Sequence, residues 1–366
     1  MNQGQALSTS FGASLQRLTL IIPSFERRRY MLRAMRYWSG LGPQVHVMDG
    51  SKVPLSEVEL AGIQGNVHYH HHALGFHDRL KCSIPHIQTE FCALISDDEF
   101  YLPSGVFAAI SYLDASPGAV ACCGRVVRFW NFADEIFWRE DYKGFIGYSV
   151  QSTDAERRMI DHMERYTPST IYGVARTDAW KNAISLLTHK EYAAFALGEL
   201  QFEIAMAFQG TSRVLEEPFW LRSAENDGVR GTDISLMPER RFETWWDSAD
   251  KVSERQEMLT SMAEHFVAWK GGDKANTEQA IKRAFNAYRH RPVSPPAKAF
   301  ILLRVFRALK WRASRVLFSR TYKPGGVWYR LDALMGYFEP AMPESAKKSL
   351  REVRTLLMHF HYGGSA

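Results

Sequence analysis

Short apolar runs alternate with stretches of helical spacing along the first half of the chain. Helical spacing is seen over Arg27–Trp38, near Ser56–Ile63, near Arg79–Gln88 and over Leu102–Leu113. Between them lie apolar runs that predict buried strands, at Arg17–Ile22, Gln44–Met48, Asn66–Tyr69, Phe91–Ile95 and Ala119–Cys123. Strands separated by helices of about 10–15 residues indicate βαβ units. The pattern predicts an α/β fold with a mostly parallel central sheet and helices on both faces.

The remainder of the chain becomes progressively more helical. The middle, about 124–235, predicts strands at Ile171–Arg176 and Ser212–Leu215 and helices at Asp154–Arg165 and Tyr192–Gln209. Further helices are predicted at Ser253–Trp269, Thr277–Tyr288, Ala297–Phe318 and Ser345–His359. We therefore expect an N-terminal tail at 1–16, an α/β domain at 17–240 and an α-helical C-terminal extension at 241–366.

Polar clusters follow three of the predicted parallel strands. Pro23-Ser24, Asp49-Gly50 and Asp97-Asp98-Glu99 all fall at the carboxyl edge of the sheet, where such folds bind ligands. Three adjacent carboxylates repel one another unless a cation joins them, and Mg²⁺ or Mn²⁺ prefers oxygen ligands, including those of a diphosphate. An acidic loop or helix start is the alternative, and the three acids alone leave both interpretations open.

Composition excludes several classes of protein. The 366 residues are 46% hydrophobic and 23% charged, which are ordinary globular values, so a disordered chain, a fibre and a disulfide-stapled miniprotein are excluded. Four cysteines are too few and too poorly spaced for a disulfide framework, which favours a reducing, cytoplasmic environment. The first 16 residues lack the features of a signal peptide, and no run is apolar enough to span a membrane.

Positive charge is concentrated near the C-terminus. The net charge is +5, but Lys282–Lys323 holds twelve Lys and Arg and no acid, so the rest of the chain sums to −7. Within this segment, Phe300–Phe318 combines an apolar stripe with arginines and Trp311, which is typical of an interfacial helix. We expect residues 297–323 to bind an anionic membrane surface from the cytoplasmic side. Packing on the catalytic domain is the alternative; nothing elsewhere in the chain supports nucleic-acid binding.

Three ordered blocks resemble the family 2-type glycosyltransferases with the GT-A nucleotide-sugar fold, of the bacterial polysaccharide type. They are LTLIIPSFERRRYMLRAMRYW, VHVMDGS and LKCSIPHIQTEFCALISDDEFYLPSGV. The resemblance covers about residues 17–125 and extends more weakly to 230. It implies transfer of a sugar from a nucleoside-diphosphate sugar to a glycan or lipid-linked glycan, with inversion at the sugar and with Mn²⁺ or Mg²⁺ as cofactor.

The resemblance also assigns roles to residues of the acidic motif. Ser96 stands where the family's DxD motif usually has its first Asp; Asp97 would contact the ribose or nucleotide, Asp98 the metal, and Glu99 is an additional metal ligand. Asp49 would contact the nucleobase. The full set expected to bind the nucleotide sugar is Pro23, Ser24, Glu26, Asp49, Lys81, Asp97 and Arg222.

A carboxylate at the start of a later helix serves as the base in that family. Glu199 is the matching residue, with Glu203 as the second choice because it lies one helical turn further on. The alternative is that both carboxylates lie on the solvent-exposed face of that helix and have no catalytic role. Glu225 or Asn226 are candidates for a third metal ligand, and Arg79, like Lys81, could reach the diphosphate unless it lies on a solvated helix face.

Other features admit less specific interpretations. The tract Tyr69-His70-His71-His72 resembles a metal-binding run, but consecutive strand residues point to alternate faces, which favours an ordinary strand edge. The aromatic residues of the segment after Cys123 border an acceptor site or pack in the core; they are Trp130, Phe132, Phe137, Trp138, Tyr142 and Phe145.

Two other functions remain as alternatives. A nucleotidyltransferase acting on sugar phosphates also uses acids at a sheet edge, but the turn PSFERRR lacks the glycines that its phosphate loop usually needs. A non-catalytic nucleotide- or glycan-binding relative is the other. The sequence contains no HExxH, GxGxxG or Walker A pattern, so zinc proteases, dinucleotide enzymes and P-loop NTPases lack their usual signatures.

Overall fold

The computed structural model describes residues 11–132, 134–194, 196–225, 241–291, 320–323, 326–338 and 342–362. Its strands are β1 (Leu18–Ser24), β2 (Gln44–Asp49), β3 (Val67–His71), β4 (Phe91–Leu94), β5 (Phe100–Tyr101), β6 (Ala119–Phe132), β7 (Glu135–Asp141), β8 (Ser149–Val150), β9 (Val174–Arg176), β10 (Thr211–Ser223), β11 (Arg320–Lys323) and β12 (Gly326–Tyr329). Its α-helices are α2 (Arg28–Trp38), α3 (Glu57–Leu60), α4 (Phe76–Ser83), α5 (Pro103–Ala115), α6 (Ala155–Glu164), α7 (Thr177–Leu187), α8 (Leu197–Gln209), α9 (Phe242–Asp247), α10 (Val252–Lys270), α11 (Lys274–His290), α13 (Leu331–Phe338) and α14 (Glu344–Tyr362).

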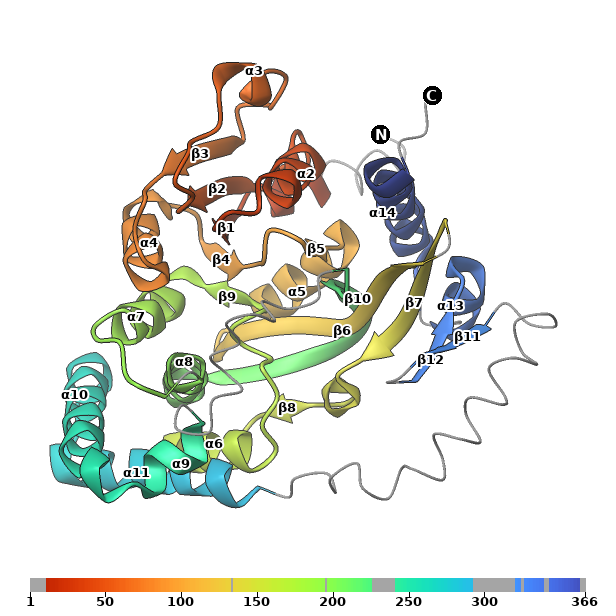
Figure 1. Ribbon diagram of the computed structural model, residues 1–366. Coiled ribbons are helices and arrows are strands. Elements are labelled where there is room, and N and C mark those ends of the chain that lie inside the picture. The colour runs from red at the N-terminus through yellow and green to blue at the C-terminus, as the bar shows by residue number, and fades with distance from the viewer. Residues whose placement is uncertain are drawn as a thin grey trace.

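The strands form one sheet whose main order is β11-β12-β7-β6-β9-β4-β1-β2-β3. Strands β3, β2, β1 and β4 run parallel to one another. Because β9 is antiparallel to both β4 and β6, β6 runs in the same direction as β4, and β10 is parallel to β6. The predicted α/β class with a mostly parallel central sheet is confirmed (Figure 1).

Helices cover both faces of the sheet, as the apolar pattern of β1 requires. Leu20 and Ile22 point into one core, which they share with residues of α2 and α5. Ile21 points into the other core, formed with residues of α4, α7 and α8. Successive residues of β1 are therefore buried in two separate cores, one on each face of the sheet. For this reason the sequence of β1 is a continuous apolar run.

Most predicted elements are present, with shifted ends. Helix α4 begins at Phe76, earlier than the predicted Arg79, and ends at Ser83, where the chain continues into the 3-10 helix η1 (Ile84–His86) with Pro85 in its first turn. Strand β6 continues to Phe132, well past the predicted Cys123, and pairs with β7, which the sequence pattern did not predict. Helix α7 was also not predicted.

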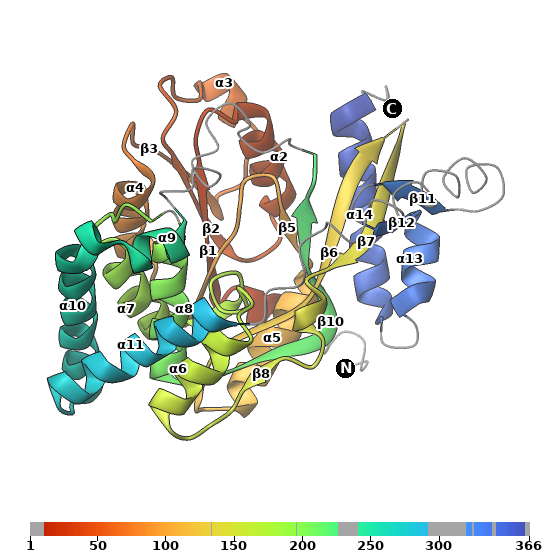
Figure 2. The same ribbon diagram turned by 60° about the horizontal axis from the view of Figure 1, so that its bottom comes forward.

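The C-terminal third supplies helices, as predicted, and also a hairpin. Strands β11 and β12 pair with each other, and β12 joins the sheet at β7. Helices α13 and α14 lie beside β7, whereas α10 and α11 lie on the far side of the molecule near α8 and α6 (Figures 1 and 2). Both groups complete cores begun by the first 240 residues. The domain boundary at 240 stays a prediction.

The predicted basic helix Ala297–Phe318 lies outside the described residues. Among the helices that the structure describes, none combines the length and apolar character needed to cross a membrane.

Leu350 tests whether α14 is an integral part of the fold. Its side chain is fully buried against the β6–β7 core, so Leu350→Ala should lower the free energy of unfolding by about 2–5 kcal/mol. The exposed Lys348→Ala on the same helix should change it by less than about 0.5 kcal/mol. Equal denaturant midpoints for both variants and the wild type would show that α14 is dispensable for stability.

Candidate active site

Three buried carboxylates follow the carboxyl end of β4. Asp97, Asp98 and Glu99 are only 2%, 7% and 8% exposed, and they occupy the turn between β4 and β5. Burial raises the pKa of Asp97 to about 6. Burial, reinforced by the charge of Asp98, raises the pKa of Glu99 to about 8. Carboxylates held this way require positive partners or hydrogen-bond donors.

The turn between β1 and α2 supplies part of that compensation. Ser24, the last residue of β1, donates a hydrogen bond from Oγ to Asp97 Oδ2 at 2.7 Å. Arg27 spans the two aspartates, with Nη1 2.9 Å from Asp97 Oδ1 and Nη2 2.6 Å from Asp98 Oδ2. Ser96 donates to Asp98 Oδ1 at 2.9 Å. The first polar turn of the chain is therefore tied directly to the acidic segment.

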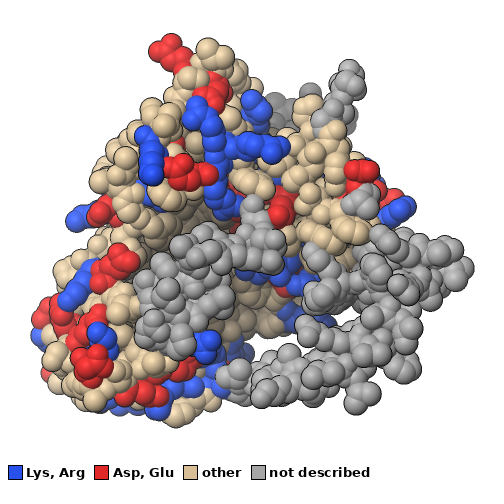
Figure 3. Space-filling model, in the orientation of Figure 1, with Lys and Arg blue, Asp and Glu red and all other residues tan. Residues whose placement is uncertain are grey.

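A second arginine, Arg33 of α2, links the acidic segment to the C-terminus. It is 2% exposed, donates to the backbone oxygen of Asp98 at 3.0 Å and forms an ion pair with Glu225 at 2.7 Å. His361 of α14 contacts the same carboxylate. Arg33 and His361 thus both contact the carboxylate of Glu225, a candidate metal ligand, and Asn226 lies outside the described residues. Figure 3 shows Lys and Arg side chains gathered over α2 beside acidic ones.

Asp49 lies beside Ser24 at the same edge of the sheet, because β1 and β2 are parallel with these two residues in register. Its carboxylate is fully buried and accepts hydrogen bonds from the Ser51 backbone at 2.9 Å and from the Tyr69 hydroxyl at 2.7 Å. Glu26 joins the two turns: its N–H donates to Ser51 Oγ at 2.8 Å. Glu26 has a φ of 55°, a left-handed conformation that is uncommon outside glycine and clusters at functional sites.

Arg79 of α4 packs against this edge. Its side chain is 4% exposed and lies against Gly50, where an added Cβ would come 2.0 Å from Nη1. Among the described residues, no group accepts a hydrogen bond from its Nε. Burial lowers the pKa of Arg79, and the charge of Asp49 opposes that shift. Lys81 is exposed and lies two residues on, about 200° around the helix from Arg79. The structure therefore brings Arg79, rather than Lys81, to the sheet edge.

Glu199 and Glu203 both belong to α8 but have different surroundings. Glu203 is fully buried and accepts hydrogen bonds from the backbones of Thr170 and Ile171, at 3.2 and 3.0 Å, and lies 2.8 Å from His162 Nε2. Its hydrogen-bonding capacity is used to hold neighbouring segments. Glu199, in the first turn, is only half-buried and has the Tyr166 hydroxyl as a donor. Burial raises the pKa of Glu199, and the Tyr166 hydrogen bond partly offsets the rise.

Aromatic rings and an arginine lie between these carboxylates and the acidic segment. Trp220 donates from Nε1 to Glu99 Oε2 at 2.7 Å and stacks on Tyr172, with ring centroids 4.5 Å apart, and on Tyr142, at 5.8 Å. The guanidinium of Arg222 lies 5.0 Å from the Tyr142 ring centre and 3.9 Å from Glu99. Burial raises the pKa of Tyr172, and the charges of Glu199 and Glu99 raise it further. The charges of both acids therefore act on Tyr172, and Trp220 contacts Glu99 directly.

The site thus joins most residues that the sequence singled out, but not all of them. Ser24 donates to Asp97, and Arg27 joins Asp97 to Asp98. The same edge is lined by Pro23, Glu26, Asp49, Glu99 and Arg222. Sequence reasoning missed Arg27, Arg33, Tyr172 and Trp220. The arginine run directly after the first strand was the signal for Arg27. Of the aromatic residues considered, Phe137, Trp138 and Phe145 are core residues, whereas Tyr142 faces the site.

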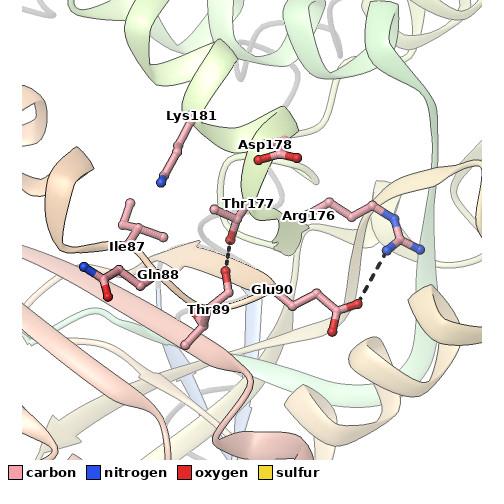
Figure 4. Close-up of a pocket in the computed structure, with 8 residues that line it drawn as sticks. All are labelled: Ile87, Gln88, Thr89, Glu90, Arg176, Thr177, Asp178 and Lys181. Carbon is pink, nitrogen blue, oxygen red and sulfur yellow. Dashed lines mark hydrogen bonds and ion pairs between the residues drawn. The ribbon is translucent and has the colours of Figure 1, made fainter.

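A separate hollow of about 330 Å³ lies at the opposite edge of the sheet (Figure 4). It is formed at the amino end of β4 and the start of α7, and its lining is Ile87, Gln88, Thr89, Glu90, Arg176, Thr177, Asp178 and Lys181. Thr177 donates to the Thr89 carbonyl at 2.7 Å across its floor. Because β4 separates it from Asp97, this hollow is not part of the candidate site.

No family model matches the chain, and no curated protein is significantly similar to it. Among solved structures, residues 1–349 of S. aureus TarS are similar in their complex with UDP-GlcNAc, with a TM-score of 0.46, 13% identity, and coverage of 94% of this chain and 92% of that chain. The complex of the same protein with UDP gives a TM-score of 0.43, 13% identity and coverage of 95% and 92%. These scores are too low to carry an assignment, so the function has to be argued from the site.

The contact between Gly50 and Arg79 gives a direct test of the site's geometry. Gly50→Ala should cost about 1–3 kcal/mol of unfolding free energy, because the new methyl group overlaps the buried guanidinium. In an Arg79→Ala background the same substitution should cost almost nothing. A double-mutant cycle by chemical denaturation measures both; equal costs in the two backgrounds would contradict the contact.

Proposed function

We propose that the chain is an inverting, metal-dependent glycosyltransferase of the family 2 type, with the GT-A fold. The observation that carries the proposal is the buried Asp97-Asp98-Glu99 segment at the carboxyl end of β4, flanked by Asp49, with Glu199 close enough that its charge and that of Glu99 both act on Tyr172. A metal-dependent, inverting sugar transfer uses a cation to stabilise the leaving diphosphate and a base to take the proton of the acceptor hydroxyl.

In this proposal, the turns after β1 and β2 hold the nucleotide. Asp49 contacts the nucleobase and Asp97 contacts the ribose. The turn between these two acids is shaped by Pro23, Ser24 and Glu26. The guanidinium of Arg79 lies beside Asp49, and that of Arg222 lies beside Glu99; both suit the diphosphate, which arginine binds through paired hydrogen bonds. Arg27, already on both aspartates, joins this set. Lys81 remains a weaker candidate because it is exposed.

The donor set fits a hard divalent ion. Asp98 and Glu99 offer carboxylate oxygens, and burial together with the charge of Asp98 disfavours the anionic form of Glu99, a cost that a cation removes. Asp98 would be the main ligand and Glu99 the second. When bound, Mg²⁺ or Mn²⁺ supplies positive charge that stabilises the departing diphosphate.

The transfer itself is a single displacement. The acceptor hydroxyl oxygen forms a bond to the anomeric carbon on the face opposite the diphosphate. Glu199 takes the hydroxyl proton, while the bond from that carbon to the diphosphate oxygen breaks and its electron pair leaves with the nucleoside diphosphate. The anomeric configuration is inverted. The partly exposed position of Glu199 leaves its carboxylate available, whereas Glu203 is fully engaged.

The acceptor in this proposal is a glycan or a lipid-linked glycan. Tyr142 and Tyr172 are partly exposed and carry ring faces that suit the C–H faces of a sugar, whereas Trp220, on which both stack, is buried. Peripheral attachment to the cytoplasmic face of a membrane through residues 297–323 stays a prediction from sequence. A nucleotidyltransferase is less well supported, because the turn after β1 has no glycine.

Substitutions at the two acids should separate chemistry from binding. Glu199→Gln should lower the turnover number for release of the nucleoside diphosphate by about 10²–10⁴-fold and leave donor affinity nearly unchanged. Asp98→Asn should weaken donor binding as well. The assay is nucleoside diphosphate release from a panel of UDP, GDP, CDP and TDP sugars with Mn²⁺ or Mg²⁺. Glu191→Gln, on an exposed neighbouring residue, is the control and should behave as wild type. Full activity in both acid variants would contradict the roles of Glu199 and Asp98, and binding of a nucleotide without any release by the wild type would favour the non-catalytic alternative.

The pH profile provides a second test of the base. Glu199 must be deprotonated to accept a proton, so its raised pKa places the acidic limb of kcat/KM above the ordinary glutamate value of about 4.3. Tyr166→Phe removes a hydrogen bond that lowers this pKa, so the limb should move to still higher pH. Tyr288→Phe, on the ring that packs edge-on against Tyr166 at 5.0 Å, is the control. A limb that stays in place in Tyr166→Phe would remove Glu199 from the role of base.

A further inference from the structure

Histidines cover one face of the sheet at its β3 edge, away from the candidate active site. His46 of β2 is in register with His68 of β3, and His70 is the next residue of β3 on the same face. His71 points to the other face, where its Nε2 lies 2.7 Å from the Ser51 carbonyl. The alternation expected from sequence is therefore correct. It brings His68 and His70 to the same face of the sheet as His46.

A third element completes the cluster. His86 ends the 3-10 helix η1 (Ile84–His86), which follows α4, and its ring stacks on His70 with centroids 4.2 Å apart and on His46 at 5.1 Å. One nitrogen from each of these three residues lies within 4.8 Å of the others. We propose that His46, His70 and His86 form a binding site for a transition-metal ion of the Zn²⁺ class, separate from the acidic segment.

The spacing of the nitrogens suits such an ion. Zn–N bonds of about 2.0–2.1 Å place tetrahedral ligand nitrogens about 3.3 Å apart. His46 Nδ1 and His70 Nε2 are 3.0 Å apart, and the other pairs lie within 4.8 Å. The stacked rings must rotate so that their lone pairs converge. His70 and His86 are partly exposed, which leaves room for that rotation and for a water molecule as fourth ligand.

The chemical state of the rings also agrees with ligation. Burial, together with the neighbouring histidines, lowers the pKa of His46 and of His70 to about 4. These imidazoles are therefore neutral near pH 7, as metal binding requires.

The two clusters of the chain differ in the ions that they favour. Imidazole nitrogens suit Zn²⁺, Ni²⁺, Co²⁺ and Cu²⁺, whereas carboxylates suit Mg²⁺ and Mn²⁺. His46 lies three residues before Asp49, about 10 Å along the strand. An ion at the histidines would join β2, β3 and η1, and so fix α4, which carries Arg79, against the sheet. This structural role is independent of the proposed transferase activity.

Zinc binding to the full chain without a polyhistidine tag tests the proposal. Competition with a chromophoric chelator should show one tight Zn²⁺ site per chain that excess Mg²⁺ does not displace. His70→Gln and His86→Gln should each weaken it by more than the roughly 10- to 100-fold that loss of an outer-shell partner costs. The melting temperature should rise with Zn²⁺ in the wild type and not in these variants.

Two controls distinguish the histidines from other ligands. His71→Gln, on the same strand but the opposite face, and Asp98→Asn, in the acidic segment, should keep the tight site. The visible spectrum of the Co²⁺-loaded wild type should show a four-coordinate, nitrogen-ligated ion, a readout that does not depend on the folding of any variant. Zinc affinity equal in His86→Gln and wild type, zinc binding lost only in Asp98→Asn, or a six-coordinate Co²⁺ spectrum would each overturn the proposal.

Discussion

Three carboxylates buried in one turn are the constraint on which the rest of the structure depends. Asp97, Asp98 and Glu99 have lost most of their hydration, so cationic and hydrogen-bonding partners must reach them from elsewhere in the chain. Arg27 comes from the turn before α2 and Arg222 from the end of β10. Arg33 binds the backbone at Asp98 and, through Glu225, connects with α14. The C-terminal helix is thus coupled to the acidic segment through a chain of buried charges.

The same principle distinguishes the two acids of α8. Glu203 receives backbone N–H donors and lies beside His162, so its carboxylate stabilises the loop around Thr170 and has no capacity left for chemistry. Glu199 has Tyr166 as a donor, and its charge acts on Tyr172, which stacks on the Trp220 ring that donates to Glu99. Burial without full compensation leaves a carboxylate with a raised pKa, which is the property that a general base needs.

The sequence was sufficient for features that depend on local pattern. Periodic apolar residues predicted the parallel strands β1 to β4 and helices such as α2 and α10. Polar residues at the ends of the strands predicted the carboxyl edge of the sheet, where Asp49 and Asp97 lie. Contacts between distant segments were beyond it: Arg33 and Glu225 are 192 residues apart, and Glu225 and His361 are 136 apart. The histidine cluster was missed for the same reason, because the tract at His70 gains its partners from β2 and η1.

Binding of a nucleotide sugar at the acidic edge is the central claim, and calorimetric titration tests it most directly. UDP, GDP, CDP and TDP sugars are titrated into the full chain with and without Mn²⁺. The account predicts that at least one of them binds in the presence of Mn²⁺ and that Asp98→Asn abolishes or strongly weakens this binding. Absence of binding by every nucleotide in both conditions, or binding unchanged in Asp98→Asn, would contradict it.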